Sequence, residues 1–411
     1  MAKIYKLTNQ FKNYDWGSAG IIPDFLNFKN DDNSPYAEMW MGTHSGAPSK
    51  AALQKDLPGD AGESLVSLSE LTGELPFLFK ILAVDKPLSI QVHPDKEQAV
   101  NGFEAEEKTA VPLQDPSRNY KDPNPKHEMI CALSEFKLMA GFRKTEEILN
   151  SFKTLVFASG DLSCLLAPMI AALEQNSLGG FLKEHFNFSA PQKEKISSEI
   201  IKIDPAALME RNSSASKPSG CAAGCGTERD ITLEQWDLMK KFACLYKKDP
   251  AVLSPLYLNI LTLRPAQAVY LPAKSLHAYL SGFGLELMNS SDNVLRGGLT
   301  PKNVDTKELL KIVNLNPFLP DVITDPLDGS FFRYPVPVKD FSLTVIRGNG
   351  NEISYNADSH VIGIVSEGEL IAEERTFKKG ESFFLPKSED RLTFKGGFTL
   401  YAASAGNALT P

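Results

Sequence analysis

The spacing of apolar residues changes twice along this chain of 411 residues, and these changes constrain its fold more than any other feature. In residues 1–143 and again in 256–411, apolar and polar residues mostly alternate or form short runs between turn signals, as in β-strands. In residues 144–255, apolar residues recur every three or four positions, as in amphipathic helices. We therefore expect a mainly β protein with a helical insertion, and a chain of this length should form more than one core.

The helical pattern is clearest in the middle of the insertion. There, apolar residues follow one helix face over three turns, and similar patterns cover 145–155, 192–203 and 233–246. Such stripes usually pack into a core, so we assign them no function. The stripe consists of Leu162, Leu165, Leu166, Met169, Ile170 and Leu173.

Residues 86–94 alternate strictly, which predicts a half-buried strand. Leu88, Ile90 and Val92 would face a core, while Ser89, Gln91 and His93 would line the opposite face. A Gln-x-His pair on one face resembles half of a metal site. The alternative is a strand that exposes its polar face to water.

A second polar segment follows at 122–133. Its prolines exclude a helix, and the alternation after them predicts a strand with Lys126 and Glu128 on one face and His127 on the other. The pair His127-Glu128 is not the start of the zinc-protease helix motif, because that motif needs a histidine where this chain has Cys131.

Two further segments contain polar residues in apolar surroundings. The run 75–84 contains one charge, Lys80, which either reaches the edge of a core or points into a pocket. His277 and Tyr279 share one face of another predicted strand. The polar, glycine-bearing segment 291–302 after it has the character of a site loop and precedes a predicted helix at 305–313.

Composition narrows the partners and the compartment. The net charge is −8, without a dense Lys/Arg stripe, so we expect no nucleic-acid footprint. No apolar run approaches the roughly 18 residues needed to cross a membrane, so we expect no membrane partner. Five scattered cysteines do not suggest a disulfide framework, and Cys221 and Cys225 lack a nearby histidine for a metal site. With no signal-peptide pattern at the start, we expect a cytoplasmic protein. A small anionic substrate is compatible with this composition.

Several of these segments occur together in one known family. The chain resembles type I mannose-6-phosphate isomerases (phosphomannose isomerases), zinc enzymes of the cupin superfamily, over nearly its whole length. The matching segments are NYDWGS (13–18), AEMWMGTHSGAPS (37–49), KPLSIQVHPDKEQA (86–99), DPNPKHEM (122–129) and SLHAYLSGFGLELMNSSDNVLRGGLTPK (275–302).

The resemblance implies a domain organisation that agrees with the changes in period. A cupin-type jelly-roll catalytic domain is expected from 1–143 and 256–315, with the helical insertion at 144–255. The remainder, 316–411, is expected to be a second, cupin-like β domain. Its only histidine is His360, so we expect that domain to be metal-free. We expect the protein to be a monomer.

The resemblance also implies a metal site. One zinc ion per chain is expected, and two imidazoles, one carboxylate and one amide oxygen are a ligand set that suits zinc. Because the amide is uncharged, the site would keep a net positive charge and act as a Lewis acid. The expected ligands are Gln91, His93, Glu128 and His277.

The implied reaction interconverts mannose 6-phosphate and fructose 6-phosphate by moving a proton between C1 and C2 through an enediol. Arg296 is the residue that similar enzymes place in the active site, and we expect it to be catalytic, with a guanidinium that suits an enediolate or a phosphate equally. The general base is left open between Lys126, whose pKa a neighbouring cation would lower, and Asp292. The expected substrate-binding residues are Ser89, Lys80, Lys302 and Tyr279.

One departure from the family is clear. The family usually reads Asn-His-Lys-Pro-Glu before the zinc glutamate, whereas this chain reads Asn124-Pro125-Lys126-His127-Glu128. The role of the missing histidine cannot pass to Pro125. Whether His127 replaces it is open, and strand parity places His127 on the face away from Glu128.

Two other functions are compatible with the same residues. Two histidines and one carboxylate also describe the iron site of a cupin oxygenase. A sugar-phosphate binding protein that keeps the fold without catalysis is the second alternative, although Lys126, Asp292 and Arg296 together favour an enzyme.

Overall fold

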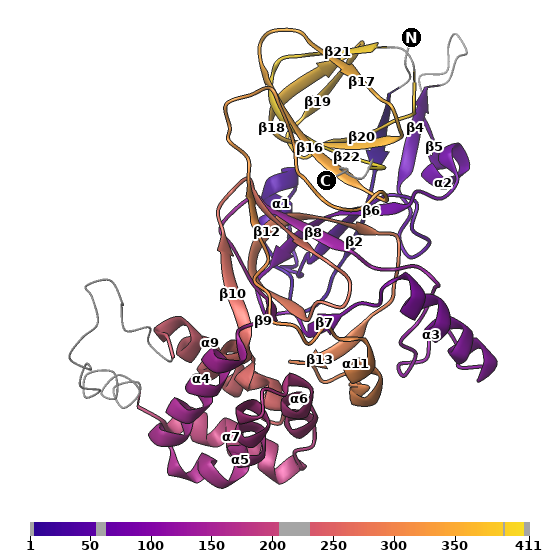
Figure 1. The fold of residues 1–411 in the computed structure, drawn as a ribbon. Helices are drawn as coiled ribbons and strands as arrows, with labels where there is room; N and C mark the ends of the chain where they lie inside the picture. Colours follow the sequence, from indigo (N-terminus) through magenta and orange to yellow (C-terminus); the bar gives the residue numbers. More distant parts are fainter. Residues whose placement is uncertain (1–3, 55–62, 205–230, 389–390, 407–411) are drawn as a thin grey trace.

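The computed structural model describes residues 4–54, 63–204, 231–388 and 391–406. Within these ranges the strands form two antiparallel sheets of eleven strands each, and most of the helices gather at one end of the molecule (Figure 1). The prediction of a mainly β fold with a helical insertion is therefore confirmed. None of the helices in the described ranges is long and apolar enough to span a bilayer.

The first sheet combines the C-terminal strands with strands from the start of the chain. β1 pairs with β20 on one side and with β4 on the other, so the sheet crosses the boundaries predicted from sequence. Those domain boundaries stay a prediction. The strands are β15 (Phe331–Arg333), β16 (Ser342–Asn349), β22 (Gly397–Ser404), β18 (Val361–Ala372), β20 (Ser382–Leu385), β1 (Tyr5–Thr8), β4 (Lys50–Gln54) and β5 (Glu63–Ser67) in order, with β17 (Ile353–Asn356), β19 (Arg375–Lys378) and β21 (Arg391–Lys395) off this path.

The second sheet carries most of the predicted site residues. Its main order is β14 (Val322–Thr324), β11 (Gln267–Leu271), β8 (Glu128–Ala132), β12 (His277–Asn289), β6 (Phe77–Val84), β3 (Glu38–Met41) and β2 (Gln10–Lys12). Off this path lie β7 (Ile90–Val92), β13 (Leu295–Gly298), β9 (Phe136–Phe142) and β10 (Leu258–Leu263).

Strand β12 joins the two parts of this sheet. Its first residues pair with β7 and β9, and from Gly282 onward it pairs with β6 and β8. Gly282 has φ +124°, and a Cβ there would lie 2.6 Å from the carbonyl oxygen of Glu135. Only glycine fits this bend, which brings residues of β7, β8 and β12 around one interior space.

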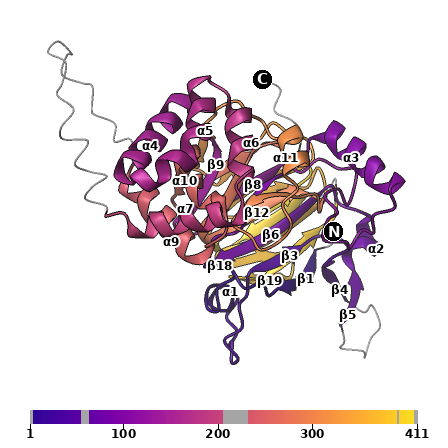
Figure 2. The ribbon, with the colours of Figure 1, turned by 90° about the horizontal axis from the view of Figure 1, so that it is seen from below.

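The helical insertion packs directly on the strands that carry the site. The buried side chains Ile90 and Val92 of β7 belong to the same core as Leu166 and Met169 of the insertion. Figure 2 shows this group of helices at one end of the strands and α3 at the other. The insertion contains α4 (Thr145–Ala158), α5 (Ser163–Glu174), α6 (Leu178–Phe186), α7 (Ala190–Lys202), α9 (Leu233–Leu245), α10 (Ser254–Tyr257) and 3-10 turns at Gly160–Leu162 and Pro250–Leu253 (η2).

Outside the insertion lie α1 (Ile21–Leu26), α2 (Leu68–Thr72), α3 (Lys96–Lys108) and α11 (Thr306–Ile312). Helix α11 and the helices predicted at 145–155, 162–173, 192–203 and 233–246 are confirmed. Helix α3 was not predicted from alternation, although Asp95 and Gln98 form a capping box that is visible in the sequence.

The strand predicted at 86–94 is much shorter in the structure. Only Ile90–Val92 form β7, because Pro87 and Pro94 at its flanks cannot donate hydrogen bonds to a neighbouring strand. The predicted sidedness holds within β7, since Ile90 and Val92 are fully buried and Gln91 faces a cavity. It is wrong for Leu88, which precedes β7 and lines two cavities together with Ser89, because the strand alternation does not extend to it. Residues 212–226, which include Cys221 and Cys225, lie outside the described residues.

Candidate active site

Three of the four predicted zinc ligands form a compact, buried cluster. Both histidine Nε2 atoms face Glu128, at 3.3 Å from His93 to Oε1 and 3.0 Å from His277 to Oε2. The potential ligand atoms all lie within 4.8 Å of one another, and no other such group occurs in the described part of the chain. The sequence therefore identified residues that the fold brings together from three strand segments.

The two imidazoles are oriented as metal ligands require. Nδ1 of His93 lies 2.7 Å from the carbonyl oxygen of Asn293, and Nδ1 of His277 lies 3.0 Å from that of Ser275. A carbonyl oxygen can only accept, so each Nδ1 carries the proton and each Nε2 presents a lone pair. Nε2 of His93 is buried without a hydrogen-bond partner. A metal ion between these atoms would satisfy it.

Gln91 lies beside this cluster. It stands directly opposite His277 on β12 and opposite Arg296 on β13, so the three side chains form a row on one face of neighbouring strands. Its Nε2 donates to Ser89 Oγ at 3.3 Å, which leaves Oε1 as the atom available to a metal. The residues present thus fit the four-ligand set implied by the sequence.

An inner cavity of about 90 Å³ adjoins the cluster. Lys126 lines it, with Nζ 3.1 Å from Glu128 Oε1, as the predicted shared face requires. Burial alone would raise the pKa of Glu128, but Lys126 and the two histidines outweigh it and hold this pKa well below its usual range. Burial and Lys126 lower the pKa of His93 to about 4. The cluster is thus in the protonation state that binds metal.

A buried ion network forms another wall of the inner cavity. Lys80 on β6 stands opposite Glu286 on β12, with Nζ 2.9 Å from Glu286 Oε2 and 3.9 Å from Glu38 Oε2. Burial would lower the pKa of Lys80, but these two carboxylates outweigh burial and raise it. Sequence analysis did not single out either glutamate. Lys80 thus occupies a pocket, where its charge is already matched.

Tyr279 also lines the inner cavity. Its hydroxyl is buried without a hydrogen-bond partner, and burial raises its pKa well above the usual value. A buried hydroxyl with no partner beside an empty space is available to a bound ligand.

A larger outer cavity of about 590 Å³ adjoins the inner one, and Glu38, Leu88, Ser89 and Gln91 line both. Arg296 and Lys302 also line it. Among the described residues, neither makes an ion pair with a carboxylate. Burial lowers the pKa of Arg296, and burial and Arg296 lower that of Lys302. Arg296 and Lys302 are therefore basic groups without an ion-pair partner among the described residues, in a cavity that Asp15, Glu38 and Lys86 also line.

Asp292 lies elsewhere. Its carboxylate is 3.5 Å from Nε2 of His44, its side chain is about half exposed, and it lines neither cavity. The structure thus separates the two candidate bases and brings only Lys126 to the metal cluster. The catalytic role of Asp292 stays a prediction.

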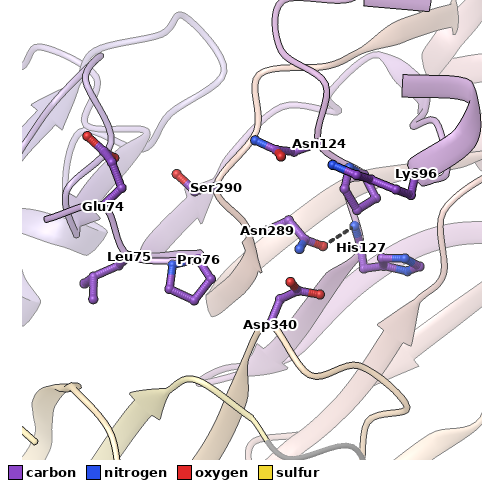
Figure 3. Close-up of a pocket in the computed structure, with 10 residues that line it drawn as sticks. Glu74, Leu75, Pro76, Lys96, Asn124, His127, Asn289, Ser290 and Asp340 are labelled. Carbon is purple, nitrogen blue, oxygen red and sulfur yellow. Dashed lines mark hydrogen bonds between the residues drawn. The ribbon is translucent and has the colours of Figure 1, made fainter. Parts of the chain in front are cut away.

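His127 points away from the cluster, as strand parity predicted. Its Nδ1 lies 2.7 Å from the hydroxyl of Tyr270, and its backbone N–H donates to Oδ1 of Asn289 at 2.9 Å. It lines a separate cavity of about 640 Å³ with Lys96 and Asp340, shown in Figure 3. That cavity shares no lining residue with the inner or outer cavity.

Fold and site together define a cupin-type metal protein with a single candidate metal centre, next to a cavity lined by Arg296 and Lys302. Comparison with known proteins makes the assignment specific. Residues 4–145 match the family described as phosphomannose isomerase type I, catalytic domain. The mannose-6-phosphate isomerase of Escherichia coli K12 is 32% identical over 406 residues, covering 95% of this chain and 97% of that protein. The human mannose-6-phosphate isomerase is 32% identical over 404 residues, covering 91% and 90%.

Comparison with solved structures supports the same family. A mannose 6-phosphate isomerase from Salmonella typhimurium bound to its substrate fructose 6-phosphate and to zinc has a TM-score of 0.80 and 30% identity, covering 99% of this chain and 100% of that one. A zinc-bound mannose 6-phosphate isomerase has a TM-score of 0.79 at the same identity and coverage. The chain belongs to the type I phosphomannose isomerase family, so the resemblance noted in the sequence is confirmed.

Proposed function

We propose that this protein is a zinc-dependent isomerase that interconverts D-mannose 6-phosphate and D-fructose 6-phosphate. The observation that carries the proposal is the connection between a buried metal cluster and a cavity with unpaired cations. Gln91 and Ser89 line both spaces, so one bound molecule can reach from the cluster to Arg296 and Lys302. A sugar phosphate needs this arrangement, with its reacting carbons at one end and its anion at the other.

Four residues would hold the zinc ion: Gln91, His93, Glu128 and His277. When bound, zinc supplies a Lewis acid that stabilises negative charge on the carbonyl oxygen of the sugar. The protein orients the imidazoles through the carbonyl oxygens of Asn293 and Ser275. The buried β-sheet walls keep bulk water away from this end of the site.

Isomerisation of mannose 6-phosphate moves the proton on C2 to C1 and the proton on O2 to O1. Lys126 is our candidate for the group that moves the carbon-bound proton, because its Nζ lies in the inner cavity beside Glu128. Asp292 is the less favoured candidate because it lies beside His44. The buried hydroxyl of Tyr279 would hold a hydroxyl group of the sugar.

Arg296 and Lys302 are our candidates for the phosphate contacts, with Ser89 between them and the metal cluster. Phosphate is recognised well by a guanidinium and an ammonium group that have no other anionic partner. Lys80 is less suited to this role than the sequence suggested, because Glu286 already matches its charge.

We also infer a monomeric enzyme in the cytoplasm. The free thiols Cys131, Cys164 and Cys244 support a reducing compartment. Light scattering of the purified full chain would measure the oligomeric state.

The test is isomerase activity on mannose 6-phosphate, measured on chelator-treated protein before and after zinc is restored. We expect activity to fall by at least about a thousandfold without metal and to return with zinc. Zinc-loaded protein without turnover would favour a binding protein, and recovery only with iron, together with oxygen uptake, would favour an oxygenase.

A further inference from the structure

The helical insertion reaches the outer cavity through a turn at its end. Tyr246, directly after α9, lines this cavity, and its hydroxyl donates to the carbonyl oxygen of Pro87 at 3.2 Å. Pro87 begins the segment that leads through Ser89 to Gln91. The backbone N–H of Asp249 donates to the carbonyl oxygen of Tyr246 at 3.0 Å, which closes the turn. The insertion therefore contacts one wall of the cavity directly.

Asp249 contacts the opposite wall. Its Oδ1 accepts a hydrogen bond from the N–H of Ala251 at 2.9 Å and so caps the 3-10 turn η2. Its Oδ2 accepts one from the N–H of Thr300 at 3.3 Å, and the N–H of Leu299 also stabilises this carboxylate. One side chain of the insertion thus ties together two backbone segments that are far apart in sequence.

The backbone of residues 298–300, which Asp249 contacts, adopts unfavourable conformations that contacts with other segments must stabilise. Gly298 has φ +129°, and a Cβ there would lie 2.2 Å from Cβ of Ala251. Leu299 has φ +52°, in the left-handed region that residues with a Cβ rarely adopt. This strained stretch lies between Arg296 and Lys302, two of the basic residues that line the outer cavity. Its shape therefore sets the distance and direction between them.

We propose that Asp249 is a positioning residue for substrate phosphate, which it serves by holding residues 298–300 so that Arg296 and Lys302 converge on one anion. This inference rests on the proposed isomerase function. It also assigns a role to the helical insertion, which contributes a wall and a clamp to the active site. Asp249 itself lines neither cavity and touches no substrate atom.

The competing explanation is that Asp249 only caps η2. Asparagine and serine separate the two roles, because both are good capping residues for the N–H of Ala251. The N–H groups of Ala251 and Thr300 bond to different oxygens of the carboxylate. In asparagine an NH2 group, which cannot accept, replaces one of these oxygens, and serine is too short to reach both N–H groups. Either substitution should keep the cap and release the segment at Thr300.

The experiment uses zinc-loaded full-length protein and measures kcat and KM for mannose 6-phosphate and competitive inhibition by inorganic phosphate. For Asp249→Asn and Asp249→Ser we expect KM and the phosphate inhibition constant to rise about tenfold, because each variant loses one charge-assisted hydrogen bond. We expect kcat to change less than about twofold. Zinc content should stay unchanged. Asp237→Asn, an exposed position on α9, removes the same charge without these contacts and should behave as the unmodified protein.

Three results would overturn the inference. Unchanged KM and phosphate inhibition in both variants would leave Asp249 as a cap only. A fall in kcat in step with thermal stability would indicate a general structural role. An unmodified protein without isomerase turnover would refute the proposed function as well, which distinguishes that failure from the first two.

Discussion

In the inner cavity each lysine forms an ion pair with a carboxylate, whereas Arg296 and Lys302 in the outer cavity form none with any described residue. Lys80 is 2.9 Å from Glu286 and Lys126 is 3.1 Å from Glu128. Asp15 and Glu38 also line the outer cavity, but neither forms an ion pair with Arg296 or Lys302. Burial of a charge is tolerated when a partner compensates for the lost hydration. The inner charges therefore belong to the structure and its chemistry, and the outer charges are available to a ligand.

The largest effect should come from Arg296, which stands at the junction of the two cavities opposite Gln91. We expect Arg296→Ala to lower kcat/KM by about a thousandfold without changing zinc content. The variant loses a guanidinium group that is already in place to donate hydrogen bonds, either to the negative charge that develops on the sugar during the reaction or to the substrate phosphate. Steady-state kinetics with metal analysis would test this. Arg264→Ala, at an exposed turn before β11, is the matched control and should keep full activity. Near-normal turnover of Arg296→Ala would show that the outer cations are not part of the site.

A substitution at the ion pair of the inner cavity should lower the stability of the protein. Glu286→Gln leaves Lys80 buried with only the more distant Glu38, and we expect it to lower the free energy of unfolding by about 3 kcal/mol. Urea unfolding followed by circular dichroism would measure this. The control is Glu381→Gln, which breaks the exposed ion pair with Lys6 and should cost less than about 1 kcal/mol. Equal costs for both variants would contradict the conclusion that burial makes the pairing of Lys80 with Glu286 part of the structure.

The smallest expected effect is the dependence of KM on pH. Burial and Arg296 lower the pKa of Lys302, so this side chain loses its proton, and its attraction for phosphate, at a lower pH than a surface lysine. We therefore expect KM for mannose 6-phosphate to rise severalfold as pH increases from 7 toward 10, where the substrate phosphate stays fully ionised. Lys302→Arg keeps its charge over this range and should give a flatter profile. An identical rise in both proteins would assign the titration to another group.

Residues that share a strand face were predictable because their grouping is local. The alternation around Gln91 and His93, and the two-residue spacing of Lys126 and Glu128, depend only on the strand period. The same parity placed His127 away from Glu128, where the structure finds it. The apolar stripe at 162–173 was predictable for the same kind of reason, because the helix period alone determines which residues of a segment share one face.

Charge matching was not predictable, because it depends on register between distant strands. Nothing near Lys80 in sequence indicates that Glu286 stands opposite it across β6 and β12. Asp292 is close in sequence to Arg296 but lies beside His44, since the loop between β12 and β13 turns its side chain out of both cavities. Residues of the site loop therefore do not all reach the site.

The sequence by itself determined the family, the residue types of the candidate ligands and the strand face on which these residues lie, because these follow from local motifs and short periods. Only the tertiary structure decided which cations remain free for an anion and how the end of the helical insertion meets the cavity at Tyr246 and Asp249. Such contacts join segments separated by many residues, and their geometry is set by strand pairing and packing across the whole fold.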